Sequence, residues 1–153
     1  CCGAAAAADR DDVAWLDRTI REARERYGLT SVYLAGFSNG GMMAQRLVAE
    51  RPDLGSRLVT WRASPSMPAP GRWPGLGVLY SGRSDTTVPI DGGQVLVGGR
   101  PTFIRPMRAA GEWLHAARLQ VVLVEGSAHD PPASWPDLAW RALSTLPGRA
   151  PAA

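Results

Sequence analysis

Gly36-Phe37-Ser38-Asn39-Gly40-Gly41 lies between an apolar, strand-like run and a helix-like run. The segment contains the pattern G-x-S-x-G, which in this context places a serine on a tight turn between a strand and a helix. Glycine permits a sharp turn and a close backbone approach that a Cβ atom would block. The five letters are weak by themselves, because a chain rich in Gly and Ser produces them by chance. An acid and a histidine must therefore follow in suitable places.

The segments around this motif alternate between strand and helix patterns. We expect helices from residue 11 or 12 to 27, over 40–50, from 103 or 104 to 119, and over 135–146. Strands are expected over 31–36, 57–63, 76–80 and 120–125, and the Gly-rich segment 91–101 is expected to be exposed. Mostly apolar strands that alternate with helices favour an α/β protein, with a mostly parallel sheet and helices on both of its faces.

Composition limits the possible classes of protein. The chain has 153 residues, of which 45% are hydrophobic and 20% charged, so residues 1–153 are expected to form one globular domain with a frayed tail at 147–153. No apolar run is long enough for a membrane span. The net charge is +3, and the arginines are dispersed among acids. We therefore expect no nucleic-acid partner.

The two cysteines, Cys1 and Cys2, are adjacent and begin the chain. Adjacent cysteines rarely have the geometry for a mutual disulfide, so they either pair with cysteines elsewhere or remain thiols. With only two histidines in the chain, no zinc spacing is present, and we expect neither a metal nor another cofactor. A start at Cys1, without Met or a signal peptide, indicates a fragment or a processed product.

A serine hydroxyl becomes a nucleophile when a histidine takes its proton, and an acid then orients that histidine. His129 lies just after the fourth expected strand, where catalytic groups of a parallel sheet gather. The alternative is a loop histidine without a role. His115 falls inside an expected helix, and a surface or packed position is the simpler interpretation. His129 is therefore the candidate base for Ser38.

The acid should lie between the serine and the histidine in the chain. Asp85 follows the third expected strand within a few residues, which makes it the preferred candidate. It could instead serve a turn beside Thr86 and Thr87. Asp91 is the second candidate, although the Gly92-Gly93 pair after it favours a turn.

A negative oxygen that forms on the substrate needs hydrogen-bond donors. The backbone N–H of Asn39, the residue after the nucleophile, is the predicted donor of this oxyanion hole. The Asn39 side chain could also cap the helix that follows, so only its amide is assigned. A second donor would come from a loop after an earlier strand, and no such strand precedes the motif.

These residues resemble the polyhydroxybutyrate depolymerase and feruloyl esterase-like family of α/β-hydrolases. The resemblance rests on Cys1-Cys2-Gly3, on 11–16, on the serine block 36–44, on the acid loop 81–93 and on Gly126-Ser127-Ala128-His129 with Trp135-Pro136. It covers nearly the whole chain up to Leu146. It implies a serine esterase with Ser38, Asp85 and His129 as its triad, acting on a small or polymeric ester, and a secreted or extracellular location.

Three departures from the family pattern are visible. Ser81-Gly82 stands where the family has His-Gly, and residues 130–134 separate His129 from Trp135-Pro136, which follow the histidine closely in the family. The family's early strands, with their oxyanion loop, are missing before Cys1. The expected fold is thus a partial α/β-hydrolase fold whose nucleophile strand forms an open sheet edge. Such an edge invites self-association and lowers stability.

The sequence therefore predicts a carboxylic ester hydrolase that works through an acyl-enzyme. Two alternatives stay open: a catalytically incompetent fragment or interaction module that retains esterase motifs, and a serine peptidase on the same fold. Trp61, Trp73 and Trp135 could line an aromatic or polymer-binding surface, although packing is the simpler role for tryptophan at these positions.

Overall fold

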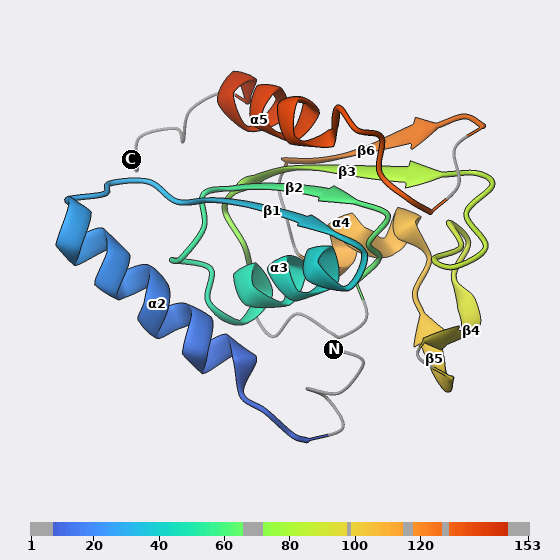
Figure 1. Ribbon diagram of the computed structural model, residues 1–153, viewed down its shortest axis with the longest axis horizontal. Coiled ribbons are helices and arrows are strands. Elements are labelled where there is room, and N and C mark those ends of the chain that lie inside the picture. Colours follow the sequence, from blue (N-terminus) through green and yellow to red (C-terminus); the bar gives the residue numbers. More distant parts are fainter. Residues whose placement is uncertain (1–7, 66–71, 98, 115–117, 127–128, 147–153) are drawn as a thin grey trace.

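The centre of the molecule is a four-stranded parallel sheet (Figure 1). The computed structural model describes residues 8–65, 72–97, 99–114, 118–126 and 129–146. The strands of the sheet lie in the order β1 (Tyr33–Phe37), β2 (Arg57–Trp61), β3 (Leu76–Gly82) and β6 (Arg118–Val124). The predicted α/β class, with a mostly parallel sheet, is confirmed.

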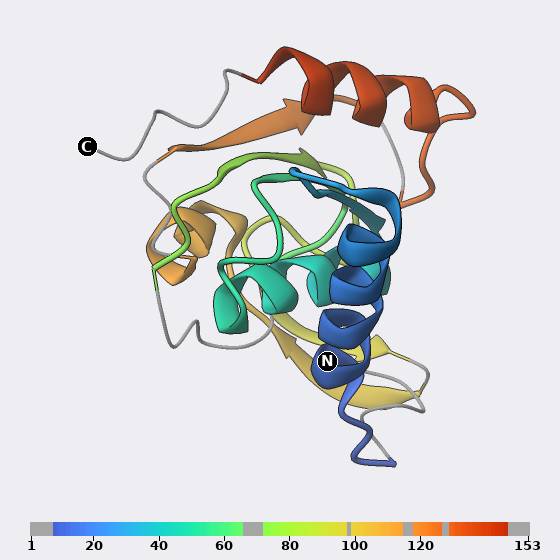
Figure 2. The same cartoon turned by 90° about the vertical axis from the view of Figure 1, so that its left-hand side faces the viewer.

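Helices cover both faces of this sheet (Figures 1 and 2). Successive residues of a strand point to opposite faces. Leu58 and Leu79 therefore belong to the cluster formed with α3 (Ser38–Glu50), whereas Val59 and Val78 pack with α5 (Trp135–Thr145). The apolar runs of β2 and β3 thus correspond to strands buried from two sides, whereas β1 and β6, at the two edges of the sheet, are partly exposed, so burial of the first strand on both faces is wrong.

Helix α2 (Asp12–Tyr27) begins and ends close to the predicted residues. The Asp11 side chain accepts a hydrogen bond from the Ala14 N–H at 2.9 Å, which satisfies one of the free donors of the first turn. Gly28 ends the helix with a φ of 63°, a left-handed conformation that glycine adopts without a Cβ penalty. Local capping chemistry thus accounts for both ends.

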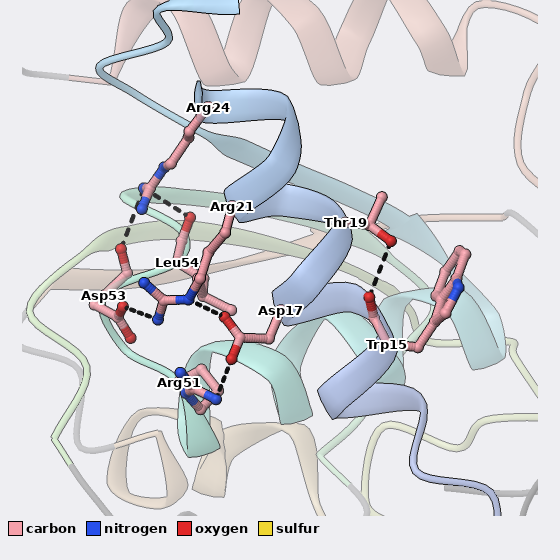
Figure 3. A network of polar contacts seen from close by, with 8 residues as sticks. All are labelled: Trp15, Asp17, Thr19, Arg21, Arg24, Arg51, Asp53 and Leu54. Carbon is pink, nitrogen blue, oxygen red and sulfur yellow. Dashed lines mark hydrogen bonds and ion pairs between the residues drawn. The ribbon is translucent and has the colours of Figure 1, made fainter. Parts of the chain in front are cut away.

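Helix α2 is held against α3 and the loop after it by apolar and polar contacts. Val13, Leu47 and Leu54 form a buried cluster between the two helices. Figure 3 shows the polar side of the same contact, where Arg21 bridges Asp17 and Asp53 on the surface. Exposed ion pairs contribute little to stability. Most of the free energy that holds α2 against α3 therefore comes from the buried apolar cluster.

No strand is expected from the sequence in the Gly-rich segment 91–101, and the structure shows that this expectation is wrong. Two strands, β4 (Gly93–Val97) and β5 (Arg100–Ile104), form an antiparallel hairpin there. Gly99, with a φ of 77°, lies in the turn between them. Two strand-forming runs separated by Gly98-Gly99 are a hairpin signal, and the high glycine content of the segment obscured it. Exposure of the segment is confirmed, since Gln94, Leu96 and Pro101 are exposed.

The predicted helix from 103 or 104 to 119 is also wrong in extent. Its beginning belongs to β5, and the helical part described up to residue 114 is limited to a short 3₁₀ turn (Met107–Ala109) and α4 (Ala110–Trp113). Its end belongs to β6, which starts at Arg118. Pairing of β5 with β4 and of β6 with β3 overrides the helical pattern. Residues 115–117, with His115, lie outside the described residues, as do Cys1, Cys2 and the predicted tail 147–153.

One edge of the four-stranded sheet is formed by β1, and the other by β6. Within the described residues β1 pairs with β2 alone, so one row of its backbone groups faces away from the sheet. We propose that this edge drives self-association. Sedimentation should show a mean mass that rises above the 16.3 kDa of one chain as concentration increases.

Two variants test whether β1 is the surface involved. Tyr33→Glu places a charge on the edge strand and should lower the degree of association, because charged edges pair poorly. Tyr27→Glu is the matched control, since Tyr27 is an exposed tyrosine that belongs to α2 and not to the edge strand. A monomer at every concentration, with thermal unfolding above about 60 °C, would contradict the proposal.

Candidate active site

Three segments that follow parallel strands meet at one edge of the sheet. Ser38 comes directly after β1, Asp85 lies in the loop after β3, and His129 lies in the segment after β6. The carboxyl ends of parallel strands share an edge, and catalytic groups of open α/β sheets gather there. The topology thus brings together residues that are 44 and 91 positions apart in the chain.

The side chains of these three residues form a continuous chain of polar contacts. His129 Nε2 lies 2.8 Å from Ser38 Oγ, and His129 Nδ1 lies 2.9 Å from Asp85 Oδ2. An ionised carboxylate can only accept hydrogen bonds, so Asp85 selects the ring form that carries its proton on Nδ1. In this form Nε2 has a free lone pair directed at the serine hydroxyl. The geometry suits removal of the Ser38 proton.

The backbone at Ser38 has a left-handed φ of 50°, which is unusual for a residue with a Cβ. Two neighbouring glycines make this turn possible. A Cβ on Gly36 would lie 2.6 Å from the Gly40 carbonyl oxygen, and one on Gly41 would lie 2.5 Å from the Ala63 Cβ. Close packing of β1, α3 and the end of β2 thus holds Ser38 in a conformation that costs about 1–3 kcal/mol.

Asp85 is buried and makes contacts through both carboxylate oxygens. Its Oδ1 accepts hydrogen bonds from the N–H groups of Thr87 and Val88, both at 2.9 Å. Its Oδ2 is left to face His129. The turn role and the role beside His129 were alternatives at the level of sequence, and the structure accommodates both, one on each oxygen. Asp91 instead lies on the surface, 3.7 Å from Arg108.

The imidazole of His129 is held between β1 and the acid loop. Its ring lies 5.1 Å from the Phe37 ring, centroid to centroid, at an angle of 45°. Only 19% of the side chain is exposed. Phe37, the residue before the candidate nucleophile, therefore limits the rotation of the candidate base, and its place in the sequence did not indicate this contact.

Arg62 is a second residue of the site that the sequence motifs did not indicate. It follows β2 and is fully buried, with its Nη1 4.0 Å from Asp85 Oδ2. Burial lowers the pKa of Arg62, and the negative charge of Asp85 acts in the opposite direction. The sequence held one indication of this role. Arg62 is an arginine at the end of an apolar strand, and the ends of such strands form the edge where Ser38, Asp85 and His129 lie.

Asn39 is the second residue of α3, in the first turn of that helix. Backbone N–H groups of a first turn point out of the helix end, where the helix dipole also favours negative charge. This position is suitable for the predicted oxyanion donor, and the role itself stays a prediction.

The three tryptophans considered as a binding surface contribute mainly to packing. Trp73 is fully buried and donates a hydrogen bond from its indole nitrogen to the Gly55 carbonyl at 2.8 Å. Trp61 is 2% exposed, and its ring lies 5.4 Å from that of Trp135 and 5.7 Å from that of Tyr80. The packing interpretation agrees with these contacts.

A cavity of about 210 Å³ lies at the opposite end of the strands from Ser38. Its walls include Tyr33, Arg57 and Leu76, the first residues of β1, β2 and β3. Because the candidate triad lies at the carboxyl ends of these strands, this cavity is not part of the candidate site.

In the described part of the chain, no cluster of three or more His, Cys, Asp or Glu side chains could hold a metal ion. None of the helices described there has the length and apolar character needed to cross a membrane.

Comparison with solved structures supports the fold. An alpha-beta serine hydrolase homologue from Coxiella burnetii matches with a TM-score of 0.58 and 15% identity over 88% of this chain. A monoacylglycerol lipase from Paleococcus ferrophilus matches with a TM-score of 0.59 and 14% identity over 87% of this chain. Est1E from Butyrivibrio proteoclasticus gives a TM-score of 0.59 and 12% identity over 86% of this chain. No family model and no curated protein matches the chain.

These likenesses establish a partial α/β-hydrolase fold. The chain spans 58% of the length of the Coxiella structure, 72% of the lipase and 66% of Est1E. At identities of 12–15% the comparisons show the fold alone, and the more specific resemblance to polyhydroxybutyrate depolymerases and feruloyl esterases stays a prediction.

Proposed function

We propose that the chain carries the catalytic residues of a serine esterase, with Ser38 as nucleophile, His129 as general base and Asp85 as the acid that orients it. The observation that carries the proposal is the unbroken contact chain from Ser38 Oγ through His129 to Asp85 Oδ2, at 2.8 and 2.9 Å. The left-handed backbone of Ser38 supports it, because a strained turn presents the hydroxyl away from the sheet.

The proposed reaction has two halves. Ser38 Oγ attacks the ester carbonyl carbon as His129 Nε2 takes the hydroxyl proton. The tetrahedral intermediate then expels the alcohol, which receives that proton from Nε2, and an acyl-enzyme remains on Ser38. Water, deprotonated by Nε2, attacks the acyl carbon, and the acid leaves as Oγ regains the proton. Asp85 stays ionised throughout and stabilises the imidazolium that forms twice.

The oxyanion of each tetrahedral intermediate would bind at the first turn of α3, with the Asn39 N–H as donor. Loss of one such donor lowers kcat by about 10²–10³. We therefore expect slow turnover if this chain acts with the Asn39 donor alone. Acylation of Ser38 is a more direct test than turnover.

The substrate class follows from the resemblance alone. We propose a carboxylic ester of polyhydroxyalkanoate, feruloyl or acetyl-polysaccharide type, outside the cell. Rates on oligomers of 3-hydroxybutyrate, on methyl ferulate and on acetylated xylan would separate these classes.

A phosphonate probe for active serines tests the proposed function. The probe should label Ser38, as located by mass spectrometry, and no labelling should occur in Ser38→Ala. Ser144, which is exposed on α5, serves as an internal control because its hydroxyl contacts only helix carbonyls among the described groups. Cleavage of p-nitrophenyl esters but not of peptides would favour the esterase over a peptidase. A folded chain in which Ser38 stays unlabelled would support the incompetent fragment instead.

A further inference from the structure

A buried positive charge lies behind the candidate acid. The side chain of Arg62 leaves the end of β2 and passes over Gly82, the last residue of β3. A Cβ on Gly82 would lie 1.1 Å from Arg62 Nη1, so the absence of this atom makes room for the guanidinium. Arg62 also has a left-handed φ of 53° and donates its backbone N–H to the Tyr80 carbonyl at 2.8 Å. The guanidinium is thus held in place by backbone and packing.

We propose that Arg62 is a positioning residue that balances the charge of Asp85 and so keeps His129 unprotonated, and able to act as a base, at lower pH. The proposal rests on the proposed function and deepens it, because it names what sets the pH range of the same site.

Arg62 and His129 face the same oxygen of Asp85. Arg62 Nη1 lies 4.0 Å and His129 Nδ1 lies 2.9 Å from Asp85 Oδ2. The two nitrogens are therefore no more than about 7 Å apart, a distance at which like charges in a protein interior repel appreciably. While Arg62 is charged, a second cation on His129 is disfavoured. Without Arg62, the imidazolium would be the only cation within ion-pair distance of this buried carboxylate among the described residues.

Other charged groups on the segments that follow β3 and β6 are solvated. Arg83 and Glu125, at the ends of β3 and β6, form an ion pair of 2.7 Å whose side chains are 59% and 74% exposed. Asp130, next to His129 in the chain, is also exposed. The contacts from the end of β1 and the start of α3 come from the Phe37 ring and the Ser38 hydroxyl, neither of which carries charge at neutral pH. Solvent weakens the exposed charges, so Arg62 and Asp85 dominate the field at the imidazole.

The experiment is an NMR titration of the His129 imidazole in the full chain. The chain has two histidines, so a His115→Gln variant assigns the signals. Arg62→Met removes the charge and should raise the pH at which His129 is half protonated by about one unit. Arg62→Lys keeps a cation and should stay nearer the wild-type midpoint.

A second variant is needed because removing one partner of a buried ion pair can prevent folding. Gly82→Ala keeps every charge and forces the guanidinium away from its place over β3. We expect it to raise the His129 midpoint by a smaller amount than Arg62→Met. Gly111→Ala is the matched control, because a Cβ there meets nothing within 4 Å and Gly111 has an ordinary φ.

The rate of Ser38 labelling as a function of pH adds a readout that a merely structural role would not produce. Arg62→Met should react about tenfold more slowly on the acidic side and nearly normally on the alkaline plateau, whereas general damage would slow labelling at every pH. An unchanged midpoint in both Gly82→Ala and any folded Arg62→Met protein would overturn the proposal. A shifted midpoint in a chain that the probe never labels would support the role of Arg62 and count against the esterase.

Discussion

Asp85→Asn will lower the rate at which Ser38 reacts with a phosphonate probe by about 10⁴-fold. The same substitution lowers kcat by about this factor in a Ser-His-Asp triad. The expected cause is a change of tautomer. An asparagine amide that turns its NH₂ group toward His129 Nδ1 cannot accept a hydrogen bond there, so the ring would place its proton on Nε2. Nε2–H would then face Ser38 Oγ as a donor, and no base would remain for the serine proton.

The fold should survive this substitution. The carbonyl oxygen of the introduced amide can still accept hydrogen bonds from the Thr87 and Val88 N–H groups, which bind Asp85 Oδ1 at 2.9 Å in the wild type. The variant also leaves the Arg62 charge without its carboxylate partner, so some loss of stability is expected. Circular dichroism and thermal unfolding would establish that the variant is folded under the conditions of the labelling experiment.

Asp91→Asn is the control, because the Asp91 side chain is exposed on the surface, where it pairs with Arg108 at 3.7 Å. It should react at the wild-type rate. Equal rates for Asp85→Asn and the wild type would remove Asp85 from the proposed mechanism. A large loss in Asp91→Asn would move the acid to the second candidate.

The elements that the sequence predicts best are those determined by residues close together in the chain. The Asp11 cap and the Gly28 stop define α2, and both depend on the chemistry of single residues. The run before Ser38 is mostly apolar because β1 is partly covered by helices, and the glycines after it permit the turn. The order of Ser38, Asp85 and His129 could be read in the same way, because each follows its own strand.

Contacts between residues far apart in the chain determine the features that the sequence did not predict. The segment 103–119 has helical periodicity, but pairing with β4 and with β3 converts both of its ends to strand. Arg62 was missed for a related reason. Its proximity to Asp85 depends on the register of β2 beside β3 and on the space above Gly82, and neither can be read from residues near Arg62 in the chain.

Gly36→Ala will destabilise the protein by about 3 kcal/mol or more, the upper range for an added methyl group in a packed interior. The new Cβ would lie 2.6 Å from three backbone atoms, the Gly40 oxygen and the nitrogen and Cα of Gly41. Backbone atoms at the start of a helix cannot move aside as a side chain can. Because a whole domain is stable by only about 5–15 kcal/mol, the variant should melt at a much lower temperature or fail to fold.

Gly40→Ala is the matched control from the same motif. A Cβ at Gly40 meets nothing within 4 Å, and Gly40 lies within α3, where alanine is favoured over glycine by about 1 kcal/mol. Chemical denaturation should therefore show Gly40→Ala at or slightly above wild-type stability and Gly36→Ala far below it. Equal losses of stability in both variants would mean that the two methyl groups destabilise the turn through the same cause. The separate role of Gly36, to let β1 and the start of α3 approach closely enough to strain Ser38, would then be wrong.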